Sequence, residues 1–452
     1  EEREGFFERL RIRMDWDDLA ENFLKQHPLS GQRAALEERV RAMIVPAQPK
    51  PAKASLTAEE RKKREEARAE AAAAMRKKEQ DALAAKVARL QHLQTLPPAD
   101  IQRIHWSNAK ELHFMEGGSG GVMVVDLQDS CVVLKQQGKA AAIELLAEQV
   151  ANAIGVRVAH VRVVRRGDSE LQEILDNVRQ CRMFGTDPVM GFGKFFGIHP
   201  DLEAQMEEWK KQAKFLAESV SVGALGILEF VPGHTLMGIH GNQLMKSPSP
   251  NLLYELGCLC ALDVLINNLD RMPLPIWQNE GNLGNVMVID NGSSVIGIDQ
   301  QVNSIMEGPA RNAYIEKVKK LIDDAKPGGE SKAIVAKLQE AMMENCGSEL
   351  SDANAQLIVN GLYKGFEAIA TAVSHCQIKQ ALDKGEQTCF ERLIFDGACL
   401  GTKPVLDIMD EANKFVCIIA SQIADHFGVK EDCSTLETSD SPKMVEPSST
   451  NV

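Results

Sequence analysis

The chain has 452 residues, 44% of them hydrophobic, and a formal net charge of −13. This length and composition predict a globular protein with a sizeable core, organised as one large domain with extensions. The acidic balance argues against binding to nucleic acid. The sequence contains no run of about 18 apolar residues that could cross a membrane. We therefore expect a cytoplasmic protein with neither nucleic acid nor a membrane as a partner.

The cysteines and the two ends of the sequence give further expectations. The ten cysteines are scattered and form no Cys-x-x-Cys pair, which favours free, buried thiols over disulfides or a zinc site. The first residue is not Met, so we expect the sequence to be a fragment of a longer protein. The polar stretch at 431–452 is rich in Ser and Pro, which predicts a disordered tail.

Residues 1–104 predict a helical N-terminal extension. Its main element is one long helix at about 57–95, where Ala, Glu, Lys and Arg dominate and no residue breaks the helix. An apolar stripe begins only near Leu83, so the later half of the helix should dock on a core. The basic residues at 61–79 alternate with acidic ones. This mixture favours a solvent-exposed helix, and the alternative is a docking face for an acidic partner.

Residues 105–231 predict a β-rich domain. The segment 112–135 has the pattern of three strands joined by a glycine turn and a polar turn. A helix is predicted at 140–155, and further strands at 156–164 and 225–233. This succession of short strands and one helix favours an antiparallel sheet.

Residues 232–430 predict a mainly helical domain. Helical periodicity runs through 251–268, 309–325, 331–345, 351–374, 378–396 and 404–427. A β-rich part followed by a helical part predicts an α+β fold with two lobes.

The turn between the first two predicted strands is rich in glycine. Its backbone N–H groups could close over phosphates, because no side chains stand in the way. A plain glycine hairpin is the simpler interpretation, since the pattern matches neither a Walker nor a Rossmann loop. The residues of this candidate phosphate-binding turn are Gly117, Gly118, Ser119, Gly120 and Gly121.

Lys135 ends the third predicted strand, and Glu144 follows about one turn into the next helix. A strand lysine paired with a helix glutamate is the arrangement by which kinases hold the phosphates of ATP. Glu148 lies one turn further along the same helix face and is the competing partner. A lysine after an apolar strand is more often a plain surface residue, so the kinase interpretation depends on other residues as well.

Three polar residues follow in chain order at the ends of predicted elements. Asp270 comes after a helix, Asn285 begins the short strand "NVMVID", and Asp299 follows the strand "SVIGI". Phosphoryl transfer needs a carboxylate for the proton of the substrate hydroxyl, and an amide and a second carboxylate as Mg²⁺ ligands. Each residue alone would be interpreted as a cap or a turn. The ordered set, together with Lys135, predicts a kinase that uses ATP and Mg²⁺.

The segment "INNLDRMPLPIWQNEGNLGNVMV" at 266–288 resembles the catalytic loop of the actin-fragmin kinase family, which is distantly similar to the phosphatidylinositol kinases. The inserted Pro-Trp-Asn-Glu-Gly piece is specific, since protein kinases of the common type lack it. The sequence has no His-Arg-Asp triplet, and Gln-Gln follows Asp299 in place of Phe-Gly. The atypical kinases share both departures. The resemblance implies a two-lobed atypical protein kinase fold.

The resemblance also implies a role for each candidate residue. Lys135 would bind the ATP phosphates, Glu144 would orient it, and Asp270 would be the catalytic aspartate. Asn285 and Asp299 would be the metal ligands. The hinge against which adenine lies would comprise Glu229, Phe230 and Val231.

In plant members of the family, this kind of domain precedes a dual-specificity phosphatase. The resemblance implies α-tubulin, within the α/β-tubulin dimer, as the substrate, phosphorylated on a threonine so that microtubules disassemble. It also implies a C-terminal phosphatase domain in the full-length chain and a MAP kinase as partners. Two other classes remain open: a lipid or small-molecule kinase similar to phosphatidylinositol kinases, and a nucleotide-binding pseudokinase that serves as an interaction module.

Overall fold

The computed structural model describes residues 95–115, 122–136, 140–165, 168–180, 224–389 and 402–430, together with Lys77, His92 and Leu93. The chain divides into two compact units, 1–83 and 84–452, and the helices and strands described below belong to the second. The predicted glycine turn, the predicted tail and most of the predicted long helix lie outside the described residues. The predicted boundaries between the domains stay predictions.

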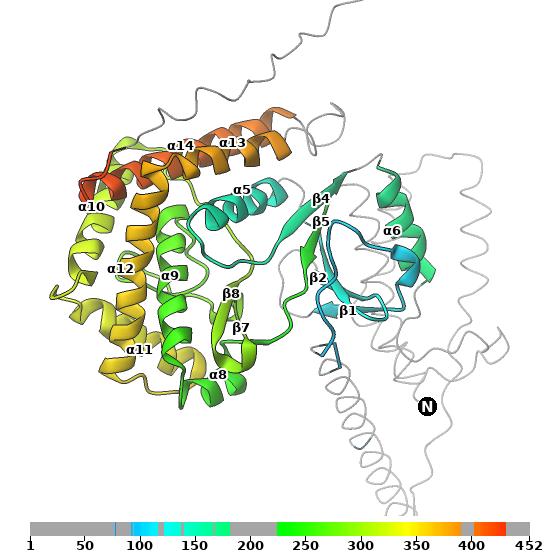
Figure 1. Cartoon of the computed structure of the whole chain (residues 1–452), viewed down its shortest axis with the longest axis horizontal. Helices are drawn as coiled ribbons and strands as arrows, with labels where there is room; N and C mark the ends of the chain where they lie inside the picture. Colours follow the sequence, from blue (N-terminus) through cyan, green and yellow to red (C-terminus); the bar gives the residue numbers. More distant parts are fainter. Residues whose placement is uncertain are drawn as a thin grey trace, which may run out of the picture. The chain divides into compact units, whose positions relative to one another are not determined.

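Within the described residues, a five-stranded antiparallel sheet forms the first part of the fold (Figure 1). Its strands are β1 (Glu111–Met115), β2 (Val122–Asp126), β3 (Cys131–Lys135), β4 (Val161–Arg165) and β5 (Ala224–Glu229), in the spatial order β1-β2-β3-β5-β4. The three strands predicted within 112–135 are confirmed. The strand predicted at 156–164 begins only at Val161, because the residues before it form a separate bridge, from Val158 to Gly297 of a second sheet.

Helices pack on both faces of this sheet, as the alternation of side chains along the strands allows. α5 (Ala140–Ala153) packs small and apolar side chains of its first turns against β4 and β5. α6 (Ser169–Gln180) packs on the opposite face through Leu171, Ile174 and Leu175. The sequence analysis missed α6, although this i, i+3, i+4 spacing is the ordinary signal of an amphipathic helix. α5 therefore lies between the sheet and the helices that follow it. Its side that carries Leu146 packs against these helices.

α9 (Pro250–Ile266) leads directly into the candidate catalytic segment. Ser249 caps its first turn, where the hydroxyl accepts a hydrogen bond from the backbone N–H of Leu252 at 3.1 Å. The helix ends at Asn267, whose backbone is left-handed with φ of 51°. This sharp ending turns the chain away from the helix axis.

α12 (Asp352–Ser374) lies against α9, and the two helices run side by side in Figure 1. A Cβ atom added to Gly257 would come within 2.0 Å of the carbonyl oxygen of Ile358. Only glycine therefore allows the two backbones to approach so closely. This contact fixes α9, and with it the start of the catalytic segment, on the helical core.

The other described helices pack around α9 and α12, and a small antiparallel sheet lies beside α9. The helices are α8 (Gly238–Met245), α10 (Gly308–Ala325), α11 (Lys332–Cys346), α13 (Gln377–Cys389) and α14 (Thr402–His426). The strands of the small sheet, in spatial order, are β6 (His234–Thr235), β7 (Val286–Ile289) and β8 (Ser294–Gly297). The predicted helices of this part are confirmed, the one at 378–396 only as far as Cys389, since 390–396 lie outside the described residues. α8 was not predicted. The mixture of helix and sheet agrees with the predicted α+β class.

The cysteines correct one expectation. Cys376 is disulfide-bonded, so the prediction that the cysteines are free thiols is wrong at this position. Burial raises the pKa of the Cys131 thiol to about 12. Because of this raised pKa, the thiol stays protonated at neutral pH. Scattered spacing predicts no particular disulfide, because pairing depends on distances in the fold. In the described part of the chain, no helix combines the length and the apolar character needed to cross a membrane.

Candidate active site

Lys135, at the end of β3, makes two ion pairs with residues outside its own strand. Its Nζ lies 3.4 Å from Oε2 of Glu144 on α5 and 2.5 Å from Oδ1 of Asp299, which follows β8. Three separate elements therefore converge on one ammonium group. The ion pair between Lys135 and Glu144 was predicted from the sequence and is present. The contact with Asp299 was not predicted, although both residues had been selected.

Burial and charge act against each other in this cluster. Burial raises the pKa of Glu144 to about 7, and the nearby Lys135 opposes this shift only in part. Burial acts to lower the pKa of Lys135, but the carboxylates of Glu144 and Asp299 outweigh it, and the pKa of Lys135 is raised. The lysine therefore stays positively charged, as a group that binds phosphates must.

Glu148, the competing partner, belongs to a different set of contacts. Its Oε1 lies 2.7 Å from Nδ1 of His160, and its Oε2 accepts a hydrogen bond from the backbone N–H of Val161 at 3.0 Å. The side chain thus ties α5 to the start of β4. Of the two glutamates, Glu144 is the partner of Lys135.

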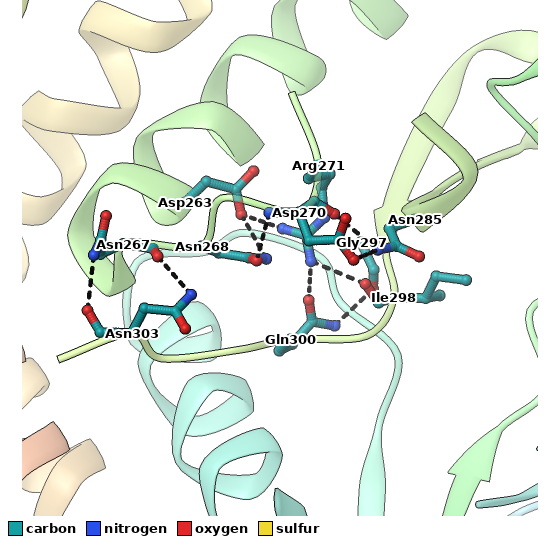
Figure 2. A network of polar contacts seen from close by, with 10 residues as sticks. All are labelled: Asp263, Asn267, Asn268, Asp270, Arg271, Asn285, Gly297, Ile298, Gln300 and Asn303. Carbon is teal, nitrogen blue, oxygen red and sulfur yellow. Dashed lines mark hydrogen bonds and ion pairs between the residues drawn. The ribbon is translucent and has the colours of Figure 1, made fainter. Parts of the chain in front are cut away.

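Asp270 and Asn285 lie together in the segment between α9 and β7 (Figure 2). The amide nitrogen of Asn285 donates hydrogen bonds to Oδ2 of Asp270 at 3.0 Å and to its carbonyl oxygen at 2.8 Å. The backbone N–H of Asp270 donates to Oδ1 of Asn268 at 3.3 Å. These contacts fix both the backbone and the carboxylate of Asp270. Its side chain is partly exposed, so that a substrate hydroxyl could reach it.

Asn285 and Asp299 lie at the same end of the β7–β8 hairpin. Val286 pairs with Gly297, and the backbone N–H of Ile298 donates to the carbonyl oxygen of Asn285 at 3.0 Å. The amide nitrogen of Asn285 faces Asp270, so its amide oxygen points away from Asp270 (Figure 2). An amide oxygen and a carboxylate that is 37% exposed are donors of the kind that Mg²⁺ prefers. The two side chains therefore fit the predicted metal site.

The predicted hinge begins at Glu229, the last residue of β5. The backbone N–H of Glu229 donates to the carbonyl oxygen of His160 at 2.8 Å, which fixes the end of the strand on its neighbour. Val231 is buried in a small apolar cluster against which Met287 of β7 and Ile298 pack while partly exposed. Such an apolar surface beside Asp299 could hold a planar ring such as adenine. Phe230 packs in a separate cluster with Leu93, Val124 and Cys131. Gly117, Gly118, Ser119, Gly120 and Gly121 lie outside the described residues.

Sequence analysis assigned no role to a buried polar cluster behind this site. Arg271, directly after Asp270, is fully buried and forms an ion pair with the fully buried Asp263 of α9. It also donates to the side chain of Gln300. Asp263 stands inside the apolar run "CLCALDVLI", and a carboxylate in such a run is the signal that could have predicted a buried cation partner.

The site combines a lysine held by a helix glutamate, a loop that presents an aspartate, and a hairpin that presents an asparagine and a second aspartate. This combination defines a phosphotransferase of the kinase type. Among known families, residues 86–366 match the actin-fragmin kinase catalytic domain. This match spans more than half of the 452 residues, and the chain belongs to that family of atypical protein kinases. No curated protein matches the chain.

Proposed function

We propose that the chain transfers the γ-phosphoryl group of ATP to a hydroxyl group of a protein, as an Mg²⁺-dependent serine/threonine kinase. The observation that carries this proposal is the convergence of Lys135, Glu144 and Asp299 beside the pair of Asp270 and Asn285. These residues come from the first sheet, α5, the catalytic segment and the β7–β8 hairpin. They supply the cation, the carboxylates and the amide that the reaction needs.

In the proposed reaction, the oxygen of the substrate hydroxyl forms a bond to the γ-phosphorus. The bond between this phosphorus and the bridging oxygen to the β-phosphate breaks, and ADP leaves with that bonding electron pair. The hydroxyl proton passes to the carboxylate of Asp270. Asn285 holds this carboxylate by the 3.0 Å hydrogen bond, so that it faces one direction. Lys135, held by Glu144, binds phosphate oxygens and balances their negative charge.

Asn285 and Asp299 would hold Mg²⁺ through an amide oxygen and a carboxylate oxygen. The bound metal would neutralise charge on the phosphates, which favours the departure of ADP. Val231, Met287 and Ile298 would hold the adenine ring on their apolar surface.

For the substrate, we favour α-tubulin. The support is the resemblance of nearly all of the chain to the N-terminal region of the plant propyzamide-hypersensitive protein, which implies phosphorylation of a tubulin threonine and loss of microtubules. The chain has a net charge of −13, so long-range repulsion should oppose its encounter with an acidic substrate. A protein substrate must then be recognised through local surfaces, as a single threonine offers few contacts.

One experiment tests these statements together. The purified chain is incubated with radiolabelled ATP and Mg²⁺ and, in parallel, with tubulin dimers, with actin and with phosphoinositide vesicles. We expect label on a threonine of α-tubulin, and incorporation at least roughly 100-fold slower with Asp270→Asn. Label on lipid alone would identify a lipid kinase. ATP binding without any transfer to substrate or to the chain itself would identify a pseudokinase, and either result would overturn the proposal.

A further inference from the structure

Arg271 contacts both neighbours of Asp299 along the chain. Its Nη2 donates to the carbonyl oxygen of Ile298 at 3.0 Å and to the side-chain oxygen of Gln300 (Figure 2). One guanidinium group thus holds the residue before and the residue after the candidate metal ligand. The planar group of arginine can do this because its several N–H donors have fixed directions.

Gln300 is 3% exposed and makes hydrogen bonds to two other elements. Its side-chain oxygen accepts from Arg271, and its side-chain nitrogen donates to the carbonyl oxygen of Gly297 in β8 at 2.8 Å. Its backbone N–H acts to lower the pKa of Glu144 on α5, against the effect of burial. Gln300, the first of the two residues that stand in place of Phe-Gly after Asp299, is therefore tied by hydrogen bonds to the catalytic segment and to the hairpin.

Asp299 itself has a backbone conformation that needs such support. Its φ is 56°, in the left-handed region that residues other than glycine rarely adopt. A backbone of this kind persists only where its surroundings hold it. The contacts of Arg271 and Gln300 hold it on both sides, so that the Asp299 carboxylate reaches Nζ of Lys135.

The same cluster also reaches Asp270. Oδ1 of Asp263 accepts from Arg271 and, at 3.3 Å, from the side-chain nitrogen of Asn268. The side-chain oxygen of Asn268 accepts from the backbone N–H of Asp270. One buried carboxylate on α9 thus anchors the loop of Asp270 and, through Arg271, the loop of Asp299.

From these contacts, and on the basis of the kinase function proposed above, we infer that Arg271 and Gln300 are positioning residues that act through Asp299. They fix the conformation in which Asp299 can hold Mg²⁺ with ATP. They touch neither nucleotide nor substrate. The contribution of the metal to ATP binding should therefore depend on them, whereas binding of ATP without metal should not.

The test compares ATP affinity, measured by calorimetry, in the presence of Mg²⁺ and in the presence of EDTA. Gln300→Leu has nearly the volume of glutamine but lacks both side-chain hydrogen bonds. We expect it to lower the Mg²⁺-dependent gain in ATP affinity by roughly 10-fold, the usual effect of losing a residue that orients a metal ligand. ATP affinity in EDTA should stay at the wild-type value. Arg271→Lys keeps the charge beside Asp263 but cannot hold two acceptors in the same way, and we expect the same loss.

Ser294→Ala provides the matched control. Ser294 lies in β8, is 4% exposed and donates a hydrogen bond to Glu255, but among the described residues it forms no hydrogen bond with Asp299 or its neighbours. The substitution Ser294→Ala should lower thermal stability without changing the Mg²⁺-dependent gain in ATP affinity. An equal loss in Ser294→Ala and Gln300→Leu would show a general structural effect and would overturn the inference.

The remaining outcomes separate this inference from the proposed function. Asp299→Asn removes the charge of the candidate ligand itself and should abolish the gain. If the wild type gains affinity with Mg²⁺, Asp299→Asn loses the gain and Gln300→Leu keeps it, the positioning role alone is wrong. If the wild type shows no gain with Mg²⁺, both the proposed function and the positioning role are wrong.

Discussion

Two clusters of charged residues meet at the loop of Asp299, one around Lys135 and one around Arg271, and they differ in their contact with solvent. In the first, the side chain of Lys135 is 14% exposed and that of Asp299 is 37% exposed. In the second, the side chains of Arg271 and Asp263 are both 0% exposed. The lysine cluster can therefore receive a ligand, whereas the arginine cluster can only hold the protein's own loops. The choice of cation agrees with this difference, because lysine is a mobile point charge and arginine a rigid fork.

The two clusters are alike in the pKa of the carboxylate that each contains, although their cations differ in exposure. Each contains a buried carboxylate, and burial raises the pKa of Glu144 and of Asp263 to about 7 in both cases. The positive partner opposes this shift but does not cancel it. A single opposite charge thus does not fully replace the water that these carboxylates lose on folding.

The largest expected effect concerns Asp270, which lies beside both clusters and belongs to neither. Asp270→Asn keeps the size of the side chain and an acceptor for Asn285, but it removes the group that takes the proton. We expect the rate of phosphoryl transfer to fall by roughly 10²–10⁴-fold. ATP affinity and the free energy of unfolding should stay near the wild-type values, because the side chain is partly exposed. Transfer kinetics, calorimetry and denaturation by urea measure the three quantities. A large loss of stability with unchanged turnover would contradict the assignment.

The second prediction tests whether the arginine cluster is structural. Asp263→Ala leaves the buried Arg271 without its counter-charge. We expect the free energy of unfolding to fall by roughly 3–5 kcal/mol, as for other broken buried ion pairs. The control is the double substitution Asp263→Leu with Arg271→Met, which removes both charges and should be less destabilising than Asp263→Ala. Urea denaturation measures both. A double variant that is less stable than the single one would show that the charges themselves stabilise the fold.

The third prediction uses the likeness of the two buried carboxylates. Burial raises the pKa of native Glu144 from its ordinary value of 4.5 to about 7. Between these values the native state binds more protons than the unfolded chain, so the free energy of unfolding should fall as pH rises through this window. Asp263, with an ordinary pKa of 3.8 and a native pKa of about 7, should contribute with the same sign.

Glu144→Gln and Asp263→Asn are the matched variants for this pH dependence. Each replaces one carboxyl group by a neutral amide of similar shape, so each should flatten the decrease between about pH 4 and pH 7. Urea denaturation at several pH values measures the slope. If neither variant changes the slope, burial does not raise these pKa values in solution. If only one variant changes the slope, the two clusters differ in the solvation of their carboxylates as well as in the exposure of their cations.

The sequence predicted the lysine cluster better than the arginine cluster, for a physical reason. Lys135, Asn285 and Asp299 stand at the ends of apolar strands, where a polar residue is conspicuous and where functional groups gather. Arg271 and Gln300 lie in irregular segments, where polar residues are common and therefore predict no particular role. The two residues are 29 positions apart in the sequence, and only the fold shows that they contact each other and are buried.

The helices show the same limit of sequence analysis. Helices with a broad apolar face, such as α12, were predicted nearly to their ends. α8, "GIHGNQLM", is only eight residues long and contains two glycines, so its local sequence does not favour a helix. Its position in the fold stabilises it, through packing against β6 and α11.

The smallest expected effect marks the boundary of the lysine cluster on α5. Glu148→Gln changes a carboxylate one turn from Glu144 that contacts His160 and the N–H of Val161 rather than Lys135. We expect a loss of about 1 kcal/mol in the free energy of unfolding, the usual value for one weakened hydrogen bond. The hydrogen bond to Glu148 raises the pKa of His160, so the substitution should lower this pKa, which NMR titration of the imidazole measures. ATP affinity should stay at the wild-type value, whereas Glu144→Gln should reduce it, because Lys135 then loses one of its two carboxylates. Equal losses of ATP affinity in the two variants would mean that α5 affects the site through its overall position and not through the Glu144 carboxylate.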